Sequence, residues 1–445
     1  MLINSLGLKN FKCFEKLDVK FAPITLLTGA NSSGKSSLIN AILAVLQTEG
    51  FPFYLSPNGK YVNMGGFEEM VFNKNIENNV SIDAHINNFH SALRRGPINF
   101  KTNWSNDDNG LPELCNMTWK SNGFELTTTN VDDKYILNVE IPHNSRYSTI
   151  INDVNISDKI YGSIFNHIEP KSALTIEKDG SVYIKDAVFA SKDKMIKNAI
   201  NPISRFVSMY FRYINSLRSS DRYFNYVGSF RLPPERTYYQ KAKASEKVLS
   251  SGEGYIDQII EWEENNPDKF NELNVIMKSL NLFDQIQSSK IKGGRFELNI
   301  STRESKQASS LTDVGFGVSQ FLPIIVADLQ MPRGSCLAIS QPEIHLHPKI
   351  QASFGNYISN QIRDNKKQYI IETHSEYLLN RIRLLLVTGE LKPEDVCVLY
   401  FENDGVKSTT YNIEFAIDGS IKGAPESFFD TYGIDVMNIA MEAIK

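Results

Sequence analysis

The sequence predicts an α/β fold whose central sheet is interrupted by a large insertion. A short apolar strand at 24–28 runs into a Gly-rich turn, and a helix with a broad apolar face is expected at 36–47. Apolar strands alternate with helices from about 295 onward, which is typical of a parallel sheet. The expected strands of this region are 336–339, 368–372 and 396–401, and the expected helices are 317–329, 348–362 and 376–386.

The segment 76–299 differs in composition and hydrophobic pattern from the regions that flank it. Up to about residue 190 it is rich in Asn, Asp and Ser and favours β-structure. Its best hairpin signal is 174–184, where two alternating arms flank Asp179-Gly180. The rest of the segment carries no sustained heptads, so no long coiled coil is predicted. Helices are expected there at 196–217, 255–262 and 270–282.

These differences in composition and hydrophobic pattern predict the domain organisation. Because strand–helix alternation occurs on both sides of the insertion, we expect residues 1–75 and 300–445 to fold together as one unit. A small extension is expected at about 400–445. Residues 76–299 are expected to project as an insertion that is β-rich to about 190 and helical afterwards.

Composition narrows the class of protein. The chain has 445 residues, is 41% hydrophobic and carries a net charge of −4, so DNA binding is possible but needs a local basic patch. Arg231 and Arg236, like 94–95, are interpreted as surface ion pairs. The scattered cysteines form no CxxC pair, which favours free buried thiols over zinc or disulfides. With neither a signal peptide nor a membrane-spanning segment, we expect a soluble cytoplasmic protein that does not enter a membrane.

A phosphate-binding loop is the strongest motif in the chain. Residues 29–36 fit G-x4-G-K-[ST], between a strand and a helix. The glycines let backbone N–H groups wrap a phosphate chain, Lys35 reaches the β- and γ-phosphates, and Ser36 ligates Mg2+. The following helix adds its N-terminal dipole to the anion site. The predicted ligands of ATP are Gly29, Asn31, Ser32, Ser33, Gly34, Lys35, Ser36 and Ser37.

Three later segments, 312–320, 337–348 and 370–375, add to this motif. In order and spacing they resemble the ABC-type ATPase heads of the SMC and OLD class, as does the opening 8–14. The resemblance implies an ABC-type head with a signature loop, formed here by Gly315, Gly317 and Ser319, which contacts the ATP held by a second subunit. It therefore implies an ATP-sandwich dimer, and larger assemblies are also compatible with it.

The same resemblance assigns roles to residues that follow two of the expected strands. His374 resembles the switch histidine that hydrogen-bonds the γ-phosphate. The family's Walker B strand ends in an acid that organises Mg2+ and is followed by a catalytic Glu, but this chain has Ser340 and Gln341 at those places. Ser340 is expected to hold Mg2+ only through water, Gln341 to orient water without accepting its proton, and Glu343 to substitute as the base. His345 and His347 form an HxH that we interpret as structural rather than metal-binding.

These features predict ATP binding with slow hydrolysis. No Asp-x-Asp cluster follows His374, so no intrinsic nuclease is expected. By analogy with the ATPases of bacterial anti-phage systems such as Septu and PARIS, the chain is expected to act as a sensor or scaffold for a separately encoded nuclease or toxin. The alternatives are an SMC-like ATPase that repairs or remodels DNA, and a transporter ATPase subunit. Salt-dependent DNA binding that stimulates ATP hydrolysis would favour the SMC-like alternative.

Overall fold

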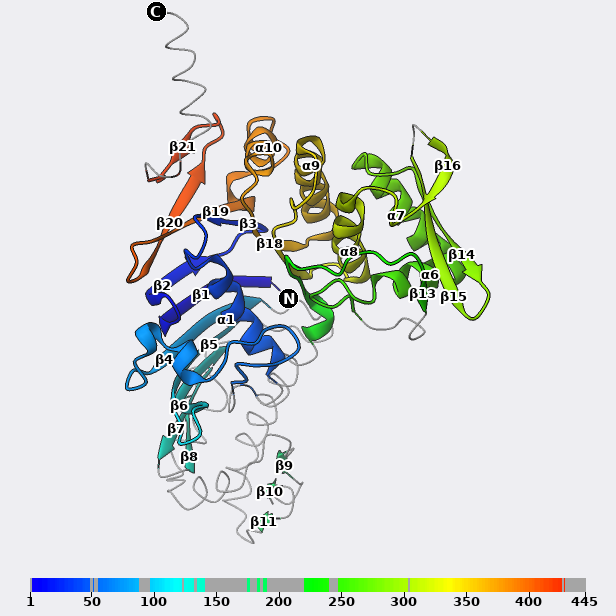
Figure 1. Cartoon of the computed structure of the whole chain (residues 1–445). Coiled ribbons are helices and arrows are strands. Elements are labelled where there is room, and N and C mark those ends of the chain that lie inside the picture. Colours follow the sequence, from blue (N-terminus) through cyan, green and yellow to red (C-terminus); the bar gives the residue numbers. More distant parts are fainter. Residues whose placement is uncertain are drawn as a thin grey trace, which may run out of the picture. The chain divides into compact units, whose positions relative to one another are not determined.

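The computed structural model describes most of the chain. The described residues are 2–48, 51, 55–87, 97–121, 124–131, 134–140, 174–176, 182–184, 187–189, 220–239, 247–302, 305–425 and 428. The chain divides into two compact units, one formed by 3–19 with 37–221 and the other by 20–36 with 222–445. Figure 1 labels the helices and strands of both units.

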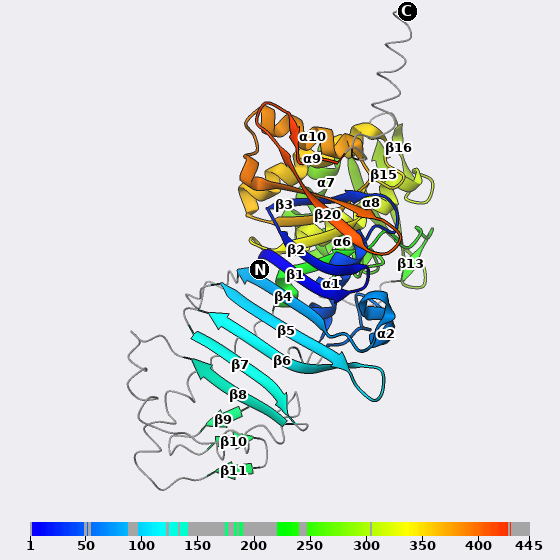
Figure 2. The ribbon, with the colours of Figure 1, turned by 90° about the vertical axis from the view of Figure 1, so that its left-hand side faces the viewer.

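The first unit is built on a seven-stranded sheet with the order β2-β1-β4-β5-β6-β7-β8, and β4 to β8 pair antiparallel. Figure 2 shows these five strands side by side. Alternate residues of β5 are buried, among them Ile98, Phe100 and Trp104, so one face of the strand lies on a core. The strands are β1 (Leu2–Phe11), β2 (Phe14–Lys20), β4 (Val80–Asn87), β5 (Ile98–Asn106), β6 (Pro112–Ser121), β7 (Phe124–Val131) and β8 (Lys134–Glu140).

Shorter elements complete the described part of this unit. They are the helices α1 (Lys35–Gln47) and α2 (Phe67–Met70), the 3-10 helices Phe72–Lys74 and Ser220–Tyr223, and the strands β9 (Leu174–Ile176), β10 (Val182–Ile184) and β11 (Ala187–Phe189). Helix α1 confirms the helix expected after the phosphate-binding loop. Strands β9 and β10 pair antiparallel and confirm the two arms of the expected hairpin. The turn of that hairpin and the helix expected at 196–217 lie outside the described residues.

The second unit contains the sheet that the sequence predicted. Its order is β12-β17-β18-β3-β19-β20-β21, and the first five strands pair parallel. This confirms the α/β fold class. The last two strands are antiparallel and were not expected. The strands are β12 (Phe224–Val227), β17 (Cys336–Ser340), β18 (Gln368–Glu372), β3 (Ile24–Gly29), β19 (Val396–Asn403), β20 (Ser408–Phe415) and β21 (Ile421–Lys422).

Helices pack against this sheet, and Figure 1 shows α9 and α10 next to one another. Almost every residue of α8 from Val318 to Leu329 is buried, as expected of a helix that is apolar on all sides. Helix α10 begins where Ser375 Oγ accepts a hydrogen bond from Leu378 N at 3.0 Å. The helices are α6 (Tyr255–Asn265), α7 (Pro267–Ser279), α8 (Phe316–Gln330), α9 (Pro348–Asn365) and α10 (Glu376–Val387), with a 3-10 helix at Pro393–Asp395. They confirm the helices expected from apolar periodicity.

A second sheet in this unit was not predicted from the sequence. Strands β13 (Tyr238–Tyr239), β14 (Gln285–Ile291), β15 (Arg295–Thr302) and β16 (Ser305–Ser310) pair antiparallel. Strands β13 and β14 lie in the part of the insertion expected to be helical, β15 crosses its expected end at 299, and β16 lies beyond it. Strand β14 is mostly polar and buries only Ile286, so it lacks a clear apolar alternation. The grouping of 1–75 with 300–445 as one domain remains a prediction.

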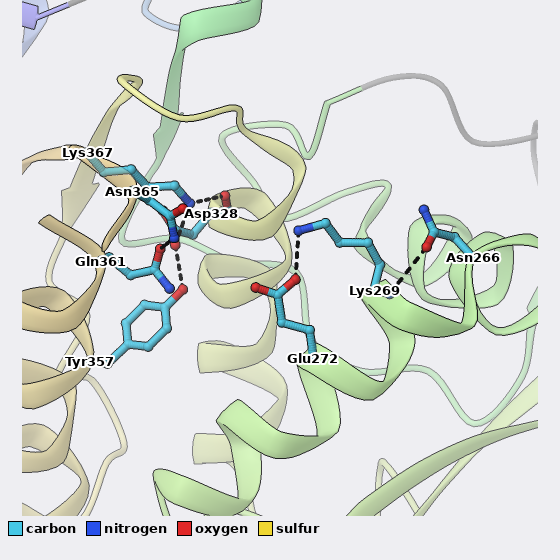
Figure 3. Close-up of polar contacts among 8 residues, drawn as sticks. All are labelled: Asn266, Lys269, Glu272, Asp328, Tyr357, Gln361, Asn365 and Lys367. Atoms are coloured by element: carbon cyan, nitrogen blue, oxygen red, sulfur yellow. Dashed lines mark hydrogen bonds and ion pairs between the residues drawn. The ribbon is translucent and has the colours of Figure 1, made fainter. Parts of the chain in front are cut away.

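A buried ion pair connects α8, α9 and the start of β18 (Figure 3). Lys367 Nζ lies 3.0 Å from Asp328 Oδ2, and the two side chains are 4% and 1% exposed. Tyr369 donates a hydrogen bond to Asp328 Oδ1 at 3.0 Å, and Tyr357 donates one to Oδ2. Burial raises the pKa of both tyrosines well above the usual value, and the negative charge of Asp328 raises it further. Both hydroxyls therefore stay protonated and donate to the carboxylate.

The cysteines only partly match the expectation of buried thiols. All four are free, but only Cys336 is buried, while Cys13, Cys115 and Cys397 are partly exposed. Burial raises the pKa of the Cys336 thiol to about 12, so this thiol is inert at neutral pH. Among the helices that the structure describes, none is long and apolar enough to cross a membrane.

Candidate functional site

The phosphate-binding loop follows the carboxyl end of β3 in a turn that requires its glycines. Gly29 has a φ of 129°, and a Cβ at this position would lie 2.2 Å from Phe401 O on the neighbouring strand. No other residue fits such a close approach. Gly34 has a φ of 108°, and Ser32 also adopts a positive φ of 59°. The loop therefore turns as the sequence motif predicts.

Lys35 points back over the loop. Its Nζ donates to Gly29 O at 2.9 Å and to Ala30 O at 2.6 Å, and the residue is 3% exposed. Burial lowers the pKa of this ammonium, while the charges of Glu372 and Glu343 oppose that shift. Both partners of Nζ are neutral carbonyl oxygens. A phosphate oxygen is a stronger partner for an ammonium, so this arrangement suits an exchange of partners when a nucleotide binds.

The remaining residues of the loop fit a nucleotide with its Mg2+. Ser33 is 1% exposed, and its Oγ has no hydrogen-bond partner among the described residues, so a donor inside the loop is left for a ligand. Asn31, Ser32 and Ser36 are exposed, and Ser37 is half-buried. Beside the loop lie hydroxyl and carboxylate oxygens, the ligand type that Mg2+ prefers. In ATPases with this loop the metal ion neutralises charge on the β- and γ-phosphates.

The carboxylate beside the loop belongs to Glu372, which was not identified from the sequence. Ser36 Oγ donates to Glu372 Oε1 at 2.9 Å and lies 3.1 Å from Oε2. Ser340 Oγ donates to Glu372 Oε2 at 3.0 Å. The signal was the acidic residue at the end of the apolar strand 368–372.

The end of β17 matches the predicted Walker B position. Ser340 lies there as predicted, and its Oγ is also 3.3 Å from Tyr226 OH. Gln341 follows with a positive φ of 49°, and its N–H donates to Glu372 O at 2.7 Å. Neither side chain carries a charge, so Glu372 is the acid nearest to Ser36 in the described hydrogen-bond network.

Glu343 holds the segment that carries His374. Its Oε2 accepts from Thr373 Oγ1 at 2.8 Å, and its Oε1 accepts from His374 N at 2.7 Å. Both carboxylate oxygens are therefore engaged. Partial burial lowers the pKa of His374, and the nearby Lys35 ammonium lowers it further, against the opposing charges of Glu343 and Glu372. The imidazole is therefore neutral at pH 7 and retains one N–H donor.

The predicted signature loop lies at the start of α8. Gly317 packs closely, since a Cβ there would lie 2.6 Å from His345 O, whereas a Cβ on Gly315 would meet nothing within 4 Å. Ser319 is buried, and its Oγ donates to Phe316 O at 2.9 Å. Among the described residues, no hydrogen bond connects Gly315, Gly317 or Ser319 with the phosphate-binding loop of the same chain.

Arg231 contradicts the expectation of a surface ion pair. It is 7% exposed, and its guanidinium donates to four backbone carbonyls. The acceptors are Gly228 O at 2.9 Å, Gln320 O at 3.1 Å, Ser340 O at 2.7 Å and Gln341 O at 3.0 Å. Burial lowers the pKa of Arg231 to about 10, so it remains charged at neutral pH. It thus joins the first turns of α8 to the carboxyl end of β17.

Arg236, by contrast, confirms the surface interpretation, because it forms an exposed ion pair with Asp313 at 2.8 Å. Residues 94–95 lie outside the described residues. His347 Nδ1 accepts from Lys349 N at the start of α9, and the ring of His345 contacts that of Phe316. Within the described ranges, no three His, Cys, Asp or Glu side chains gather in a way that could hold a metal ion by themselves.

A phosphate-binding loop at the carboxyl edge of a parallel sheet, with a hydroxyl and an acid beside it, defines the class of P-loop nucleotide-binding proteins. Residues 1–379 match the model of the AAA ATPase domain family, and the chain belongs to this family. Membership implies ATP binding, usually with Mg2+. No curated protein matches the sequence.

Solved structures of SMC heads are similar to this chain. The SMC head domain from Thermotoga maritima is 12% identical, with 92% of this chain and 98% of that chain covered and a TM-score of 0.40. The Smc head domain from Pyrococcus furiosus, with an extended coiled coil and bound to the C-terminal domain of ScpA, is 10% identical, with 100% and 99% covered and a TM-score of 0.44. The family assignment rests on the match to the AAA ATPase domain model.

Proposed function

We propose that this chain is an ATP-dependent switch that hydrolyses ATP slowly. ATP and Mg2+ bind at 29–37, Gly315, Gly317 and Ser319 of a second copy close over the nucleotide, and the dimer controls a separately encoded effector. The supporting observation is the pairing of a complete phosphate-binding loop with Gln341 at the place of the catalytic Glu. A neutral amide orients water but cannot take its proton. ATP is therefore expected to stay bound for a long time before it is hydrolysed.

Lys35→Ala is expected to weaken ATP binding by about 10- to 100-fold, because a charge-assisted hydrogen bond to phosphate contributes about 1.5–3 kcal/mol. Isothermal titration calorimetry with ATPγS measures this effect on the full chain. The control is Lys392→Ala, which removes an exposed ammonium that lies 3.9 Å from Glu394 and far along the sequence from the loop. Equal affinities in wild type and Lys35→Ala would contradict nucleotide binding at this loop.

The slow-hydrolysis part of the proposal has its own measurement. Steady-state hydrolysis by the purified protein is expected to stay below one ATP per second, and turnover of many ATP per second would overturn it. Adding duplex DNA distinguishes this proposal from the main alternative, because DNA would stimulate ATP hydrolysis by an SMC-like ATPase in a salt-dependent manner. No stimulation is expected here.

Gly315→Asp is expected to prevent dimer formation on nucleotide while preserving nucleotide binding. A Cβ at this position meets nothing within 4 Å, but the φ of 20° and ψ of 137° of Gly315 lie outside the left-handed region and strain any residue that has a side chain. Urea unfolding of the variant therefore checks that it is folded. Its carboxylate would face the phosphates held by the second copy. Sedimentation velocity with ATPγS and Mg2+ is expected to give a dimer for wild type and a monomer for the variant. A wild-type protein that stays monomeric would rule out the ATP-sandwich arrangement.

The effector is the part of the proposal that rests on resemblance to anti-phage ATPases. Co-expression with the products of neighbouring genes, followed by mass measurement of the purified complex, identifies such a partner. We expect the complex to change its composition or its nuclease activity when ATPγS replaces ADP. A partner that is bound equally in both nucleotide states, with unchanged activity, would contradict control by ATP.

A further inference from the structure

Glu372 lies where an acid is needed and where the Walker B strand does not supply one. Ser340 and Glu372 are register partners in the parallel strands β17 and β18. Strand β18 also pairs with β3, and Glu372 lies opposite Leu27, two residues before the phosphate-binding loop begins. A carboxylate on β18 is therefore one strand closer to the loop than a carboxylate on β17 would be.

The contacts of this carboxylate are those of a metal-organising group. Both of its oxygens lie within 3.1 Å of the hydroxyl of Ser36, the loop residue that ligates Mg2+ in such ATPases. The hydroxyl of Ser340 donates to Oε2 from the other side. Oxygen groups from two strands and a helix start thus converge, and the Ser36 hydroxyl with the Glu372 carboxylate matches the hard ligands that Mg2+ takes together with phosphate oxygens.

The charge of Glu372 has no cationic partner in the described part of the chain. The residue is 6% exposed, and none of the ion pairs among the described residues includes it. The nearest cation in the loop, Lys35, donates instead to Gly29 O and Ala30 O. The carboxylate is hydrogen-bonded only by neutral hydroxyls, and the Lys35 ammonium attracts it without forming an ion pair, so a divalent cation beside it would supply the direct counter-charge.

Glu343 is less suited to this role. Its two oxygens are already engaged by Thr373 Oγ1 and His374 N, and it has no hydrogen bond to Ser36. Its contacts make it a positioning residue for the His374 segment. Glu372 is thus the acid that both the geometry and the charge select.

We propose that Glu372 replaces the missing Walker B acid and, together with Ser36, organises the Mg2+ of bound ATP, with Ser340 orienting the carboxylate. This inference rests on nucleotide binding at the loop, as proposed above. It changes the expected roles of Ser340 and Glu343: Ser340 acts through Glu372, and Glu343 acts through the backbone of His374. Gln341 keeps its neutral side chain at the predicted place of the catalytic Glu, in agreement with slow hydrolysis.

The test is the Mg2+ dependence of ATPγS binding to the full chain, measured by calorimetry in Mg2+ and in excess EDTA. Wild type is expected to bind more tightly in Mg2+. In Glu372→Gln, the affinity for ATPγS in Mg2+ is expected to fall by about 10- to 100-fold. The affinity for ATPγS in EDTA is expected to stay within about threefold of the wild-type value. The control Glu394→Gln, which neutralises an exposed carboxylate outside the site, is expected to keep the Mg2+ effect.

A purely structural role of Glu372, in which it only fixes Ser36, gives a different result, since binding would then weaken equally in Mg2+ and in EDTA. That result would overturn the inference. If wild type bound no ATPγS in either condition, the proposed function would fail instead, so the two failures are distinguishable.

A reciprocal variant keeps the inference testable if Glu372→Gln does not fold. Ser340→Asp combined with Glu372→Ser moves the carboxylate to the register partner on β17. The pair is expected to restore at least part of the Mg2+ effect, whereas Glu372→Ser alone is expected to lack it. Full retention of the Mg2+ effect in Glu372→Ser would contradict the inference.

Discussion

Replacing Asp328 with asparagine is expected to lower the free energy of unfolding by about 3–5 kcal/mol, because it leaves the buried charge of Lys367 without its partner. The carboxylate of Asp328 accepts from Tyr357, Tyr369 and Lys367, and all three groups are donors. An asparagine offers one acceptor oxygen and turns an NH2 group toward donors. The loss therefore combines an unpaired charge with an unsatisfied polar contact.

Urea unfolding checks this, followed by hydrogen exchange of peptides from α8, α9 and β18. The matched control is Glu272→Gln, which removes the exposed pair Lys269–Glu272 drawn in the same view (Figure 3). That pair is about two-fifths exposed on each side and contributes at most about 1 kcal/mol. If Asp328→Asn were as mild as Glu272→Gln, the buried carboxylate would not be needed to compensate Lys367.

Arg231→Ala is expected to destabilise the second unit by at least about 3 kcal/mol, because four backbone carbonyls lose their common donor and each buried, unpaired acceptor costs about 1–3 kcal/mol. Gln320 O belongs to α8, and Ser340 O and Gln341 O lie at the end of β17, so the variant is also expected to loosen the link between the end of β17 and the predicted signature loop. Arg231→Lys keeps the charge but cannot span the same acceptors, and it is expected to be intermediate.

The control for this prediction is Arg236→Ala. Arg236 is mostly exposed and pairs with Asp313 at the surface, so its loss is expected to change stability by less than about 1 kcal/mol. Urea unfolding compares the stabilities, and sedimentation with ATPγS and Mg2+ compares dimer formation. Arg231→Lys is expected to show weaker dimer formation than Arg236→Ala at equal nucleotide occupancy. Identical dimer formation in the two would show that Arg231 is only a structural residue.

Local sequence signals were sufficient for much of the second unit. Apolar runs at 336–339, 368–372 and 396–401 became buried parallel strands, because strands covered on both faces need continuous apolar residues. The periodicities at 317–329 and 376–386 became helices for the corresponding reason. Strand β14 escaped prediction, because its mostly polar residues carry little burial pattern. Strand β15 does carry an apolar alternation, with Phe296, Leu298 and Ile300 buried, but it lies in a region for which helices were expected.

The phosphate-binding loop was determined by the sequence alone, because its function lies in the backbone of eight consecutive residues and in the chemistry of Lys35 and Ser36. The carboxylate beside that loop was decided only by the tertiary structure. Glu372 is 336 residues away from Ser36 along the chain and reaches it because β18 lies between β17 and β3. Strand order is a property of the folded sheet, so no spacing in the sequence shows which acid faces the loop. The same reason applies to Arg231, because its acceptors at Gly228, in α8 and at the end of β17 come together only when these parts of the chain pack.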